Sequence, residues 1–441
     1  MGLSLRSPFD RDIARLAIPA VGALAAEPLY ILTDTAIVGR LGTPQLGGLA
    51  VAATLVLTGY SLFIFLAYGT TGTVARLLGA GQSDWAAAQG VQAMWLAAGV
   101  GLALSVLGLV LAEPAVSLMG AGPEVAPFAL TYLRISMVGV PSLMLVLAGT
   151  GYLRGLQDTR TPLVVAVVSA LGNLVVELVL VFGLDLGIAG SAWSTVLAQT
   201  GAAAVYVTIV VRHVRAAAVS VRPDRAALGA LATVSRDLFV RTAALRASLL
   251  VATAVAARTG VVDLGAHQVA FELWSFLALV LDAIAIAGQA MVGRLLGAGD
   301  AEGARTASRR MVEWGVVAGL GFALVVVALA GVLPRLFSDD EQVVRLAASL
   351  LVWVAVLQPV NAVVFVLDGV LIGAGDLRFL ARAMSLAALA FVPVAVGVRL
   401  LDLGIGWLWA AIALLMVVRL VTLERRWRGG AWAVVGAERV R

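Results

Sequence analysis

The residues best suited to chemistry are acids inside long apolar stretches. Glu27 and Asp34 are seven residues apart in the stretch over 14–38, and Tyr30 lies between them. On a helix this spacing places all three side chains on one face. An ionised side chain at mid-membrane costs roughly 2.5–3.5 kcal/mol on insertion scales, so each acid is a candidate functional residue.

A second polar pair, Asn173 and Glu177, is spaced by four residues in the stretch over 161–183 and also faces one way. If the two patches meet in the fold, their carboxyl groups could hold one proton near neutral pH, because like charges repel and burial disfavours charge. Carboxylate and amide oxygens equally suit a hard cation such as sodium. If the patches meet, Asp34, Asn173 and Glu177 would form an ion-coupling site for a proton or for sodium, and composition does not choose between the two.

The stretch that carries Asp34 should also be able to bend. Pro19 and Pro28 interrupt it, and a proline inside a helix removes a backbone hydrogen bond and favours a kink. We expect this helix to change shape between states, with Pro19 as the hinge.

The composition is that of a polytopic membrane protein. Of 441 residues, 61% are apolar and only 13% charged, whereas soluble proteins have about 25% charged residues. A span needs about 20 residues, so there is material for roughly 12 helices. All 31 basic residues are arginines in short segments between apolar runs, which gives no reason to expect a nucleic-acid partner. Without cysteine and with two histidines, the chain offers no thiol or histidine metal cluster, and we expect no metal, cofactor or enzyme activity.

An internal repeat organises the chain. Four anchors recur 218 residues later, and a shared ungapped offset indicates duplication. The anchors are RLGTPQLGGLAVA at 40–52 with RTGVVDLGAHQVA at 258–270, VARLLGAGQ at 74–82 with VGRLLGAGD at 292–300, GYLRGLQD at 151–158 with GVLIGAGD at 369–376, and Pro141 with Pro359.

The predicted fold is all-α, with twelve transmembrane helices in two parallel six-helix repeats. Because six is even, the second copy enters the membrane in the same direction as the first. We expect an N-terminal lobe over 1–211, a cytoplasmic linker over 212–236 and a C-terminal lobe over 237–441. The expected spans are 14–38, 46–75, 90–112, 128–152, 161–183, 188–211, 237–259, 264–293, 312–333, 346–371, 378–400 and 405–424.

The arginines predict the orientation. Twenty-five of the 31 lie in the connections on the same side as both termini, and basic residues favour the cytoplasmic side. This places both termini in the cytoplasm, and we expect a bacterial inner membrane location.

The second lobe has acids of its own at Asp282 and Asp368. They are not repeat equivalents of the first-lobe acids, since Asp34 corresponds to Ala252 and Asp368 to Thr150. This asymmetry favours ion coupling in the first lobe, with the second-lobe acids as further candidates.

Four segments resemble the multidrug and toxic compound extrusion (MATE) family, in particular its bacterial DinF branch. They are YILTDTAIVGRLGT at 30–43, GNLVVELVLVFGLDLGIAGSAWSTVLAQ at 172–199, IAGQAMVGRLLGAGD at 286–300 and ERRWRGGAW at 424–432. The resemblance covers nearly the whole chain. It implies a cation-coupled antiporter that exports amphipathic compounds by alternating between outward-open and inward-open states.

The resemblance also implies roles for residues. It assigns the ion-linked site to Asp34, Asn173 and Glu177, although the family usually has Asp where Glu177 stands. A polar network for cargo comprises Tyr30, Tyr132 and Thr195, to which we add Thr150, and Glu27 stands where an uncharged polar residue is expected. The expected partners are small organic substrates, cationic or neutral, and membrane lipids, and the chain is expected to be a monomer.

Two other transporter classes share such a plan. A lipid-linked precursor flippase needs several arginines in its cavity, whereas the predicted span interiors contain almost none. A major-facilitator carrier normally has an acidic and arginine-rich motif between its second and third helices, where this chain has GAGQSDWAAA. Both classes are therefore less favoured.

Overall fold

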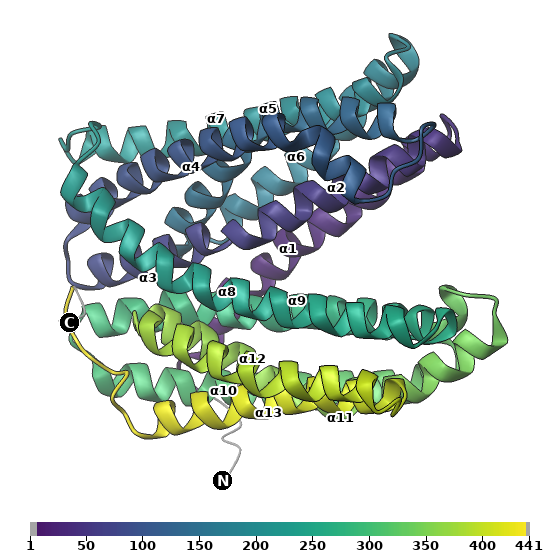
Figure 1. Cartoon of the computed structure of the whole chain (residues 1–441). Coiled ribbons are helices and arrows are strands. Elements are labelled where there is room, and N and C mark those ends of the chain that lie inside the picture. The colour runs from purple at the N-terminus through teal and green to yellow at the C-terminus, as the bar shows by residue number, and fades with distance from the viewer. Residues whose placement is uncertain (1–6, 438–441) are drawn as a thin grey trace. The chain divides into compact units, whose positions relative to one another are not determined.

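The computed structural model describes residues 7–437, and within that range the regular elements are all helices (Figure 1). Twelve helical spans are long and apolar enough to cross a membrane, which confirms the predicted number. The elements are α1 (Asp10–Gly39), α2 (Thr43–Phe63), α3 (Phe65–Gly79), α4 (Ser83–Leu118), α5 (Ala126–Gly155), α6 (Arg160–Leu178), the π-helical turn η1 (Val179–Gly183), α7 (Gly187–Ala216), α8 (Arg225–Thr259), α9 (Val261–Gly297), α10 (Ala301–Leu329), the 3-10 turn η2 (Leu333–Leu336), α11 (Glu341–Gly373), α12 (Leu377–Leu400) and α13 (Ile405–Arg428). Helices α2 and α3 form one span, and η1 continues α6.

The described chain forms two compact units, and α1 contributes to both. One unit is Pro19–Ser235, and the other joins the described residues up to Ile18 to the chain from Arg236 onward. The boundary inside α1 therefore falls at Pro19, where the proline lacks a backbone N–H.

The expected linker over 212–236 contains the end of one helix, the start of the next and the segment between them. Helix α7 continues to Ala216 and α8 begins at Arg225, so most of residues 212–236 is helical. The segment between these helices is held on α4, because Trp95 Nε1 donates to the Val221 carbonyl at 2.9 Å and Gln92 Nε2 donates to the Arg222 carbonyl at 3.0 Å.

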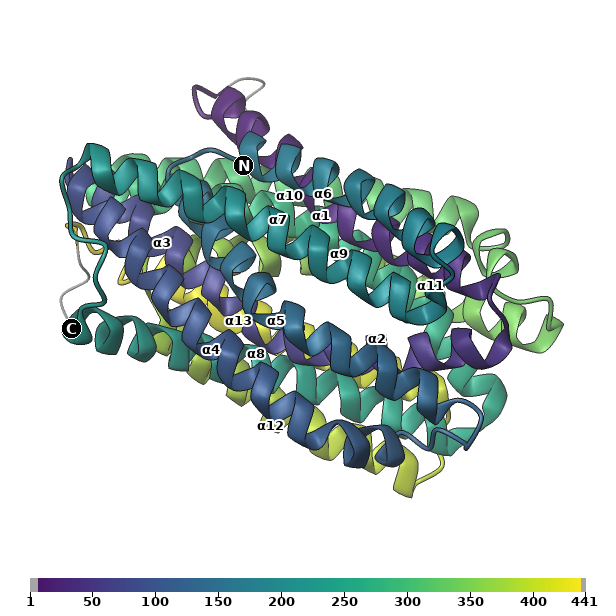
Figure 2. The same ribbon diagram turned by 90° about the horizontal axis from the view of Figure 1, so that it is seen from above.

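Each unit is built around the same helix of the repeat. Helix α5 packs against α2, α3, α4 and α7 in the first unit, and its repeat equivalent α11 packs against α9, α10, α12 and α13 in the second. Helices α4 and α5 run side by side in both views (Figures 1 and 2). These central helices hold the other helices of each unit in place.

Glycines at repeat-equivalent positions set the close packing of the central helices. A Cβ on Gly151 would lie 2.4 Å from the Ala67 carbonyl oxygen, and a Cβ on Gly369 would lie 2.3 Å from that of Ala285. The same holds where α4 and α10 cross the central helices, since a Cβ on Gly101 or Gly319 would lie 2.6 or 2.9 Å from the Cα of the inner proline, Pro141 or Pro359. The duplicated glycines thus preserve one helix-packing geometry, as small residues do in membrane helices.

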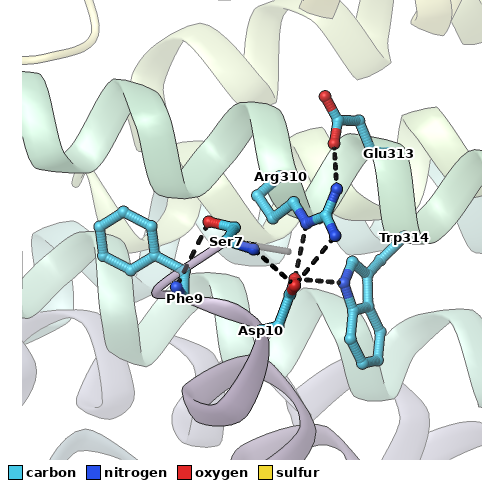
Figure 3. Close-up of polar contacts among 6 residues, drawn as sticks. All are labelled: Ser7, Phe9, Asp10, Arg310, Glu313 and Trp314. Atoms are coloured by element: carbon cyan, nitrogen blue, oxygen red, sulfur yellow. Dashed lines mark hydrogen bonds and ion pairs between the residues drawn. The ribbon is translucent and has the colours of Figure 1, made fainter. Parts of the chain in front are cut away.

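The start of α1 is anchored within the second unit by a charged cluster on α10 (Figure 3). Arg310 donates from Nε and Nη2 to the two carboxylate oxygens of Asp10, at 2.6 and 2.9 Å. Trp314 Nε1 donates to the same carboxylate at 2.9 Å, and the Ser7 amide donates to it at 2.8 Å. The remaining guanidinium nitrogen of Arg310, Nη1, donates a hydrogen bond to Glu313 Oε2 at 2.6 Å. A bidentate pair with this support is geometrically specific, so the first turn of α1 is fixed to α10.

We predict that Gly151→Ala destabilises the protein by about 1–3 kcal/mol, because the new methyl group overpacks a backbone contact. The matched control is Gly99→Ala on α4, where a Cβ meets nothing within 4 Å. That control should be neutral or slightly stabilising, since alanine is the better helix former. Unfolding in detergent, followed by circular dichroism, measures both variants, and equal stability of the two would contradict the packing argument.

Candidate transport cavity

The first unit holds a partly open cavity of about 310 Å³ that is lined by α1, α2, α3, α5, α6 and α7. Apolar side chains form most of its wall. Six of the predicted site residues line it: Glu27, Tyr30, Asp34, Tyr132, Thr150 and Thr195. Pockets of this size, with an apolar wall and a few polar groups, are typical of sites for small organic molecules.

The two predicted acidic patches meet beside this cavity. Asn173 Nδ2 donates to Asp34 Oδ1 at 3.2 Å, and Glu177 lies within electrostatic range of Asp34. Asp34 lines the cavity, while Asn173 and Glu177 are outside its wall. The exposed fractions of Asp34, Asn173 and Glu177 are 4%, 2% and 0%, so this cluster is almost free of solvent.

The cluster has more acceptors than donors. Among the described residues, three oxygens of this cluster have no hydrogen-bond partner. They are the two carboxyl oxygens of Glu177 and the amide oxygen of Asn173. Buried acceptors without partners are costly. A proton on one carboxyl group would donate to the other and remove their repulsion, and a cation coordinated by these oxygens would have the same effect. Either way, the cluster is suited to take up one positive charge.

Hydroxyl groups connect α1 to the far side of the cavity. The Tyr30 hydroxyl donates to Thr195 Oγ1, which itself donates to the Ser191 carbonyl at 3.2 Å. Deeper along the cavity, Thr150 donates to the Tyr206 hydroxyl oxygen at 3.1 Å. Tyr132 is buried in the same wall. The predicted polar network is therefore brought together, with Glu27 exposed beside it on α1.

Sequence reasoning missed several polar residues of the wall. Helical spacing carried a signal for some of them: Thr195, Gln199, Ala202 and Tyr206 follow one face of α7 at intervals of four, three and four. On α5, residues that line the cavity recur at intervals of three or four from Tyr132 to Arg154. Extending each predicted face along its helix would have found these residues. The further polar lining residues are Thr35, Tyr60, Ser136, Arg154, Ser169, Gln199 and Tyr206.

A π-helical turn follows Glu177 closely in the chain. Helix α6 ends at Leu178, one residue after Glu177, and η1 begins at Val179. Gly190 of α7 allows a close approach here, since its Cβ would lie 2.9 Å from the Leu180 carbonyl carbon. Such turns are frequent at functional sites, and this one had no sequence signal that we used.

Comparison with known proteins assigns the family. Residues 19–179 and 239–396 match the family model described as MatE, which covers most of the chain and both halves of the repeat. The chain belongs to the MATE family.

This MATE chain is similar in sequence to curated proteins and in fold to solved structures. It is 31% identical to Protein DETOXIFICATION 44, chloroplastic, of Arabidopsis thaliana, over 96% of this chain and 81% of the relative. It is 29% identical to DNA damage-inducible protein F of Escherichia coli strain K12, over 96% and 94% of the two chains. The crystal structure of the Vibrio cholerae MATE transporter VcmN in the bent form has a TM-score of 0.85 at 21% identity, covering 96% of each chain, and shows the fold.

In the second lobe of this MATE transporter, the buried acid Asp368 is paired with arginines. Asp368 on α11 is 5% exposed and accepts hydrogen bonds from two arginines, Arg241 at 2.6 Å and Arg419. The expectation that span interiors hold almost no arginine is therefore wrong, because these arginines were counted with the cytoplasmic connections. Asp282 is half-buried on α9. Asp368 therefore lies between two guanidinium groups, whereas Asp34 has an amide donor.

We predict that Asp368→Asn lowers the unfolding free energy by about 3–5 kcal/mol, because it leaves two buried guanidinium groups without a counter-charge. The matched control is Asp402→Asn, whose ion pair with Arg399 is exposed and should contribute at most about 1 kcal/mol. Denaturant unfolding in detergent compares the two. A small loss for both variants would show that the buried triad does not stabilise the lobe.

Proposed function

We propose that this MATE transporter is a secondary active antiporter. It exports amphipathic organic compounds, cationic or neutral overall, in exchange for protons or sodium. One observation carries the proposal: Asp34 lines the cavity and is also bonded to the buried Asn173 and interacts with Glu177. The same carboxyl group can therefore respond to cargo and to the coupling ion.

Competition at Asp34 provides the coupling. A cationic cargo is favoured when the cluster is negative, and an incoming proton or sodium ion removes that charge. A ligand shifts a conformational equilibrium only through its different affinities for the two states. If the ion weakens the binding of cargo by a given factor, cargo must weaken the binding of the ion by the same factor. Such mutual weakening is what antiport requires.

The bend of α1 supplies the moving part of the proposal. Its first turn is fixed to α10 by the cluster around Asp10, its later part carries Tyr30 and Asp34, and the boundary between the compact units falls at Pro19. A change at Asp34 then acts on a helix whose start is held elsewhere. We propose Pro19 as the hinge that takes up the difference.

The cavity wall argues against a flippase for polyanionic lipid precursors. Such a protein needs several cationic side chains facing its cargo, whereas this wall has a single arginine together with Glu27 and Asp34. The observed charge is better matched to cargo with a positive group.

We expect Asp34→Asn to abolish gradient-driven uptake in proteoliposomes, because an amide cannot exchange a proton or neutralise a cation. Uptake of a fluorescent cationic dye is measured with a proton gradient and with a sodium gradient, applied separately. The gradient that drives uptake by the wild-type protein identifies the coupling ion. Glu177→Gln should impair uptake more than Asp282→Asn at matched protein amounts. Full activity of Asp34→Asn, or a larger effect at Asp282, would move the coupling site.

For orientation, we propose a bacterial inner membrane location with both termini in the cytoplasm. Single cysteines at Ser83, Ala216 and Gly429 of this cysteine-free chain should react with an impermeant maleimide from the cytoplasmic side only. Cysteines at Ala121 and Asp339 should react from the opposite side only. A reversed pattern at two or more positions contradicts the orientation.

A further inference from the structure

Arg154 is a charged residue in the cavity wall that the coupling scheme does not use. It lies in the last turn of α5 with only 7% of its surface exposed, and it lines the cavity. Among the described residues, its side chain has no hydrogen-bond or ion-pair partner, in contrast to the paired Arg241 and Arg419. Because a charge within a membrane-spanning helix is stabilised by an opposite charge, a guanidinium that lines the cavity without a protein partner can bind an anionic group of a molecule in the cavity.

The helix end does not account for this residue by itself. A cation in the last turn of a helix gains typically about 0.3–1 kcal/mol from the helix dipole, which a solvated arginine would gain as well. The dipole explains why arginine is tolerated at this end of α5. It does not provide an acceptor for the guanidinium protons.

The cavity that Arg154 lines carries groups of both charges. The Tyr60 hydroxyl lies within electrostatic range of both Arg154 and Glu27, and all three residues line the cavity. Tyr206 lies within range of Arg154 too. Its oxygen accepts a hydrogen bond from Thr150, so its own proton is directed to another acceptor. The cavity therefore offers a guanidinium and a phenol donor near one another, with carboxyl groups at Glu27 and Asp34.

We propose that Arg154 binds a carboxylate of the cargo and that the cavity therefore prefers zwitterionic amphiphiles. The guanidinium offers a carboxylate two parallel hydrogen bonds, and Tyr206 can add a third. The cargo's ammonium group then lies on the side of Glu27 and Asp34, and its apolar part lies against the aliphatic wall. A doubly charged phosphate fits less well, because one arginine would face it together with two acidic residues. This inference rests on the proposed function only in taking the cavity as the cargo site.

The test uses one fluorescent scaffold in three charge states. Nε-dansyl-lysine is a zwitterion, its methyl ester is a cation, and its Nα-acetyl derivative is an anion. Binding to the full-length protein in detergent is followed by dansyl fluorescence, without any ion gradient. Wild type should bind the zwitterion about tenfold or more tighter than the ester, as expected for a charge-assisted pair, and tighter than the acetylated anion.

Arg154→Gln should reduce the preference for the zwitterion over the ester to about one, and Arg154→Lys should retain part of it because the charge remains. The matched control is Arg160→Gln, at the exposed start of α6, which should keep the full preference. Unchanged affinity for the cationic ester shows that Arg154→Gln is folded. If that variant loses affinity for all three ligands, Arg154→Lys decides: equal loss of all three there means a purely structural role and overturns the proposal.

Two further results overturn it. One is a wild type that binds zwitterion and ester equally, and the other is an Arg154→Gln variant that keeps the wild-type preference. Neither result touches the proposed antiport, since gradient-driven uptake of the cationic ester would still demonstrate it. Loss of that uptake, with the binding preference intact, would instead contradict the proposed function alone.

Discussion

A charge inside a membrane has to be neutralised, and the two lobes of this protein meet that requirement in opposite ways. In the second lobe, Asp368 is neutralised by Arg241 and Arg419, which are themselves buried. In the first lobe, Asp34 and Glu177 are placed together with a single amide donor from Asn173. The first arrangement gives its acid two cationic partners, whereas the second places two carboxyl groups with one amide donor. The proposed ion coupling follows from that difference.

The two lobes nevertheless share one scaffold. Repeat-equivalent glycines make the same close approaches, Gly151 to Ala67 and Gly369 to Ala285, and α5 and α11 hold equivalent central places. Packing of this kind depends on small residues and tolerates changes of polarity on other helix faces. Polar side chains could therefore diverge between the lobes without changing the helix packing, leaving a cavity with carboxyl groups in one lobe and a buried ion triad in the other.

Helix α1 carries both the ion pair that anchors it on α10 and the polar residues that line the cavity. Its first turn is held by Arg310 and Trp314 (Figure 3). Its later turns present Tyr30 and Asp34 to the cavity. The anchor on α10 includes a bidentate ion pair, and the contact at Tyr30 is a hydroxyl pair with Thr195. A helix held firmly at one end and by exchangeable polar contacts at the other is suited to bend between them, and Pro19 lies at that point.

The sequence by itself determined the twelve spans, the duplication and the shared face of Glu27, Tyr30 and Asp34, because apolar length and helical period are local properties. Only the tertiary structure decided that Asp34 meets Glu177, that Arg154 faces the cavity and that Asp368 lies between two arginines. Each of these pairings depends on how a helix is rotated and tilted against its neighbours, which spacing within one helix does not specify. Arginine shows the limit most clearly: at a helix end, the same residue type can face water, an acid or a cavity, and only packing distinguishes them.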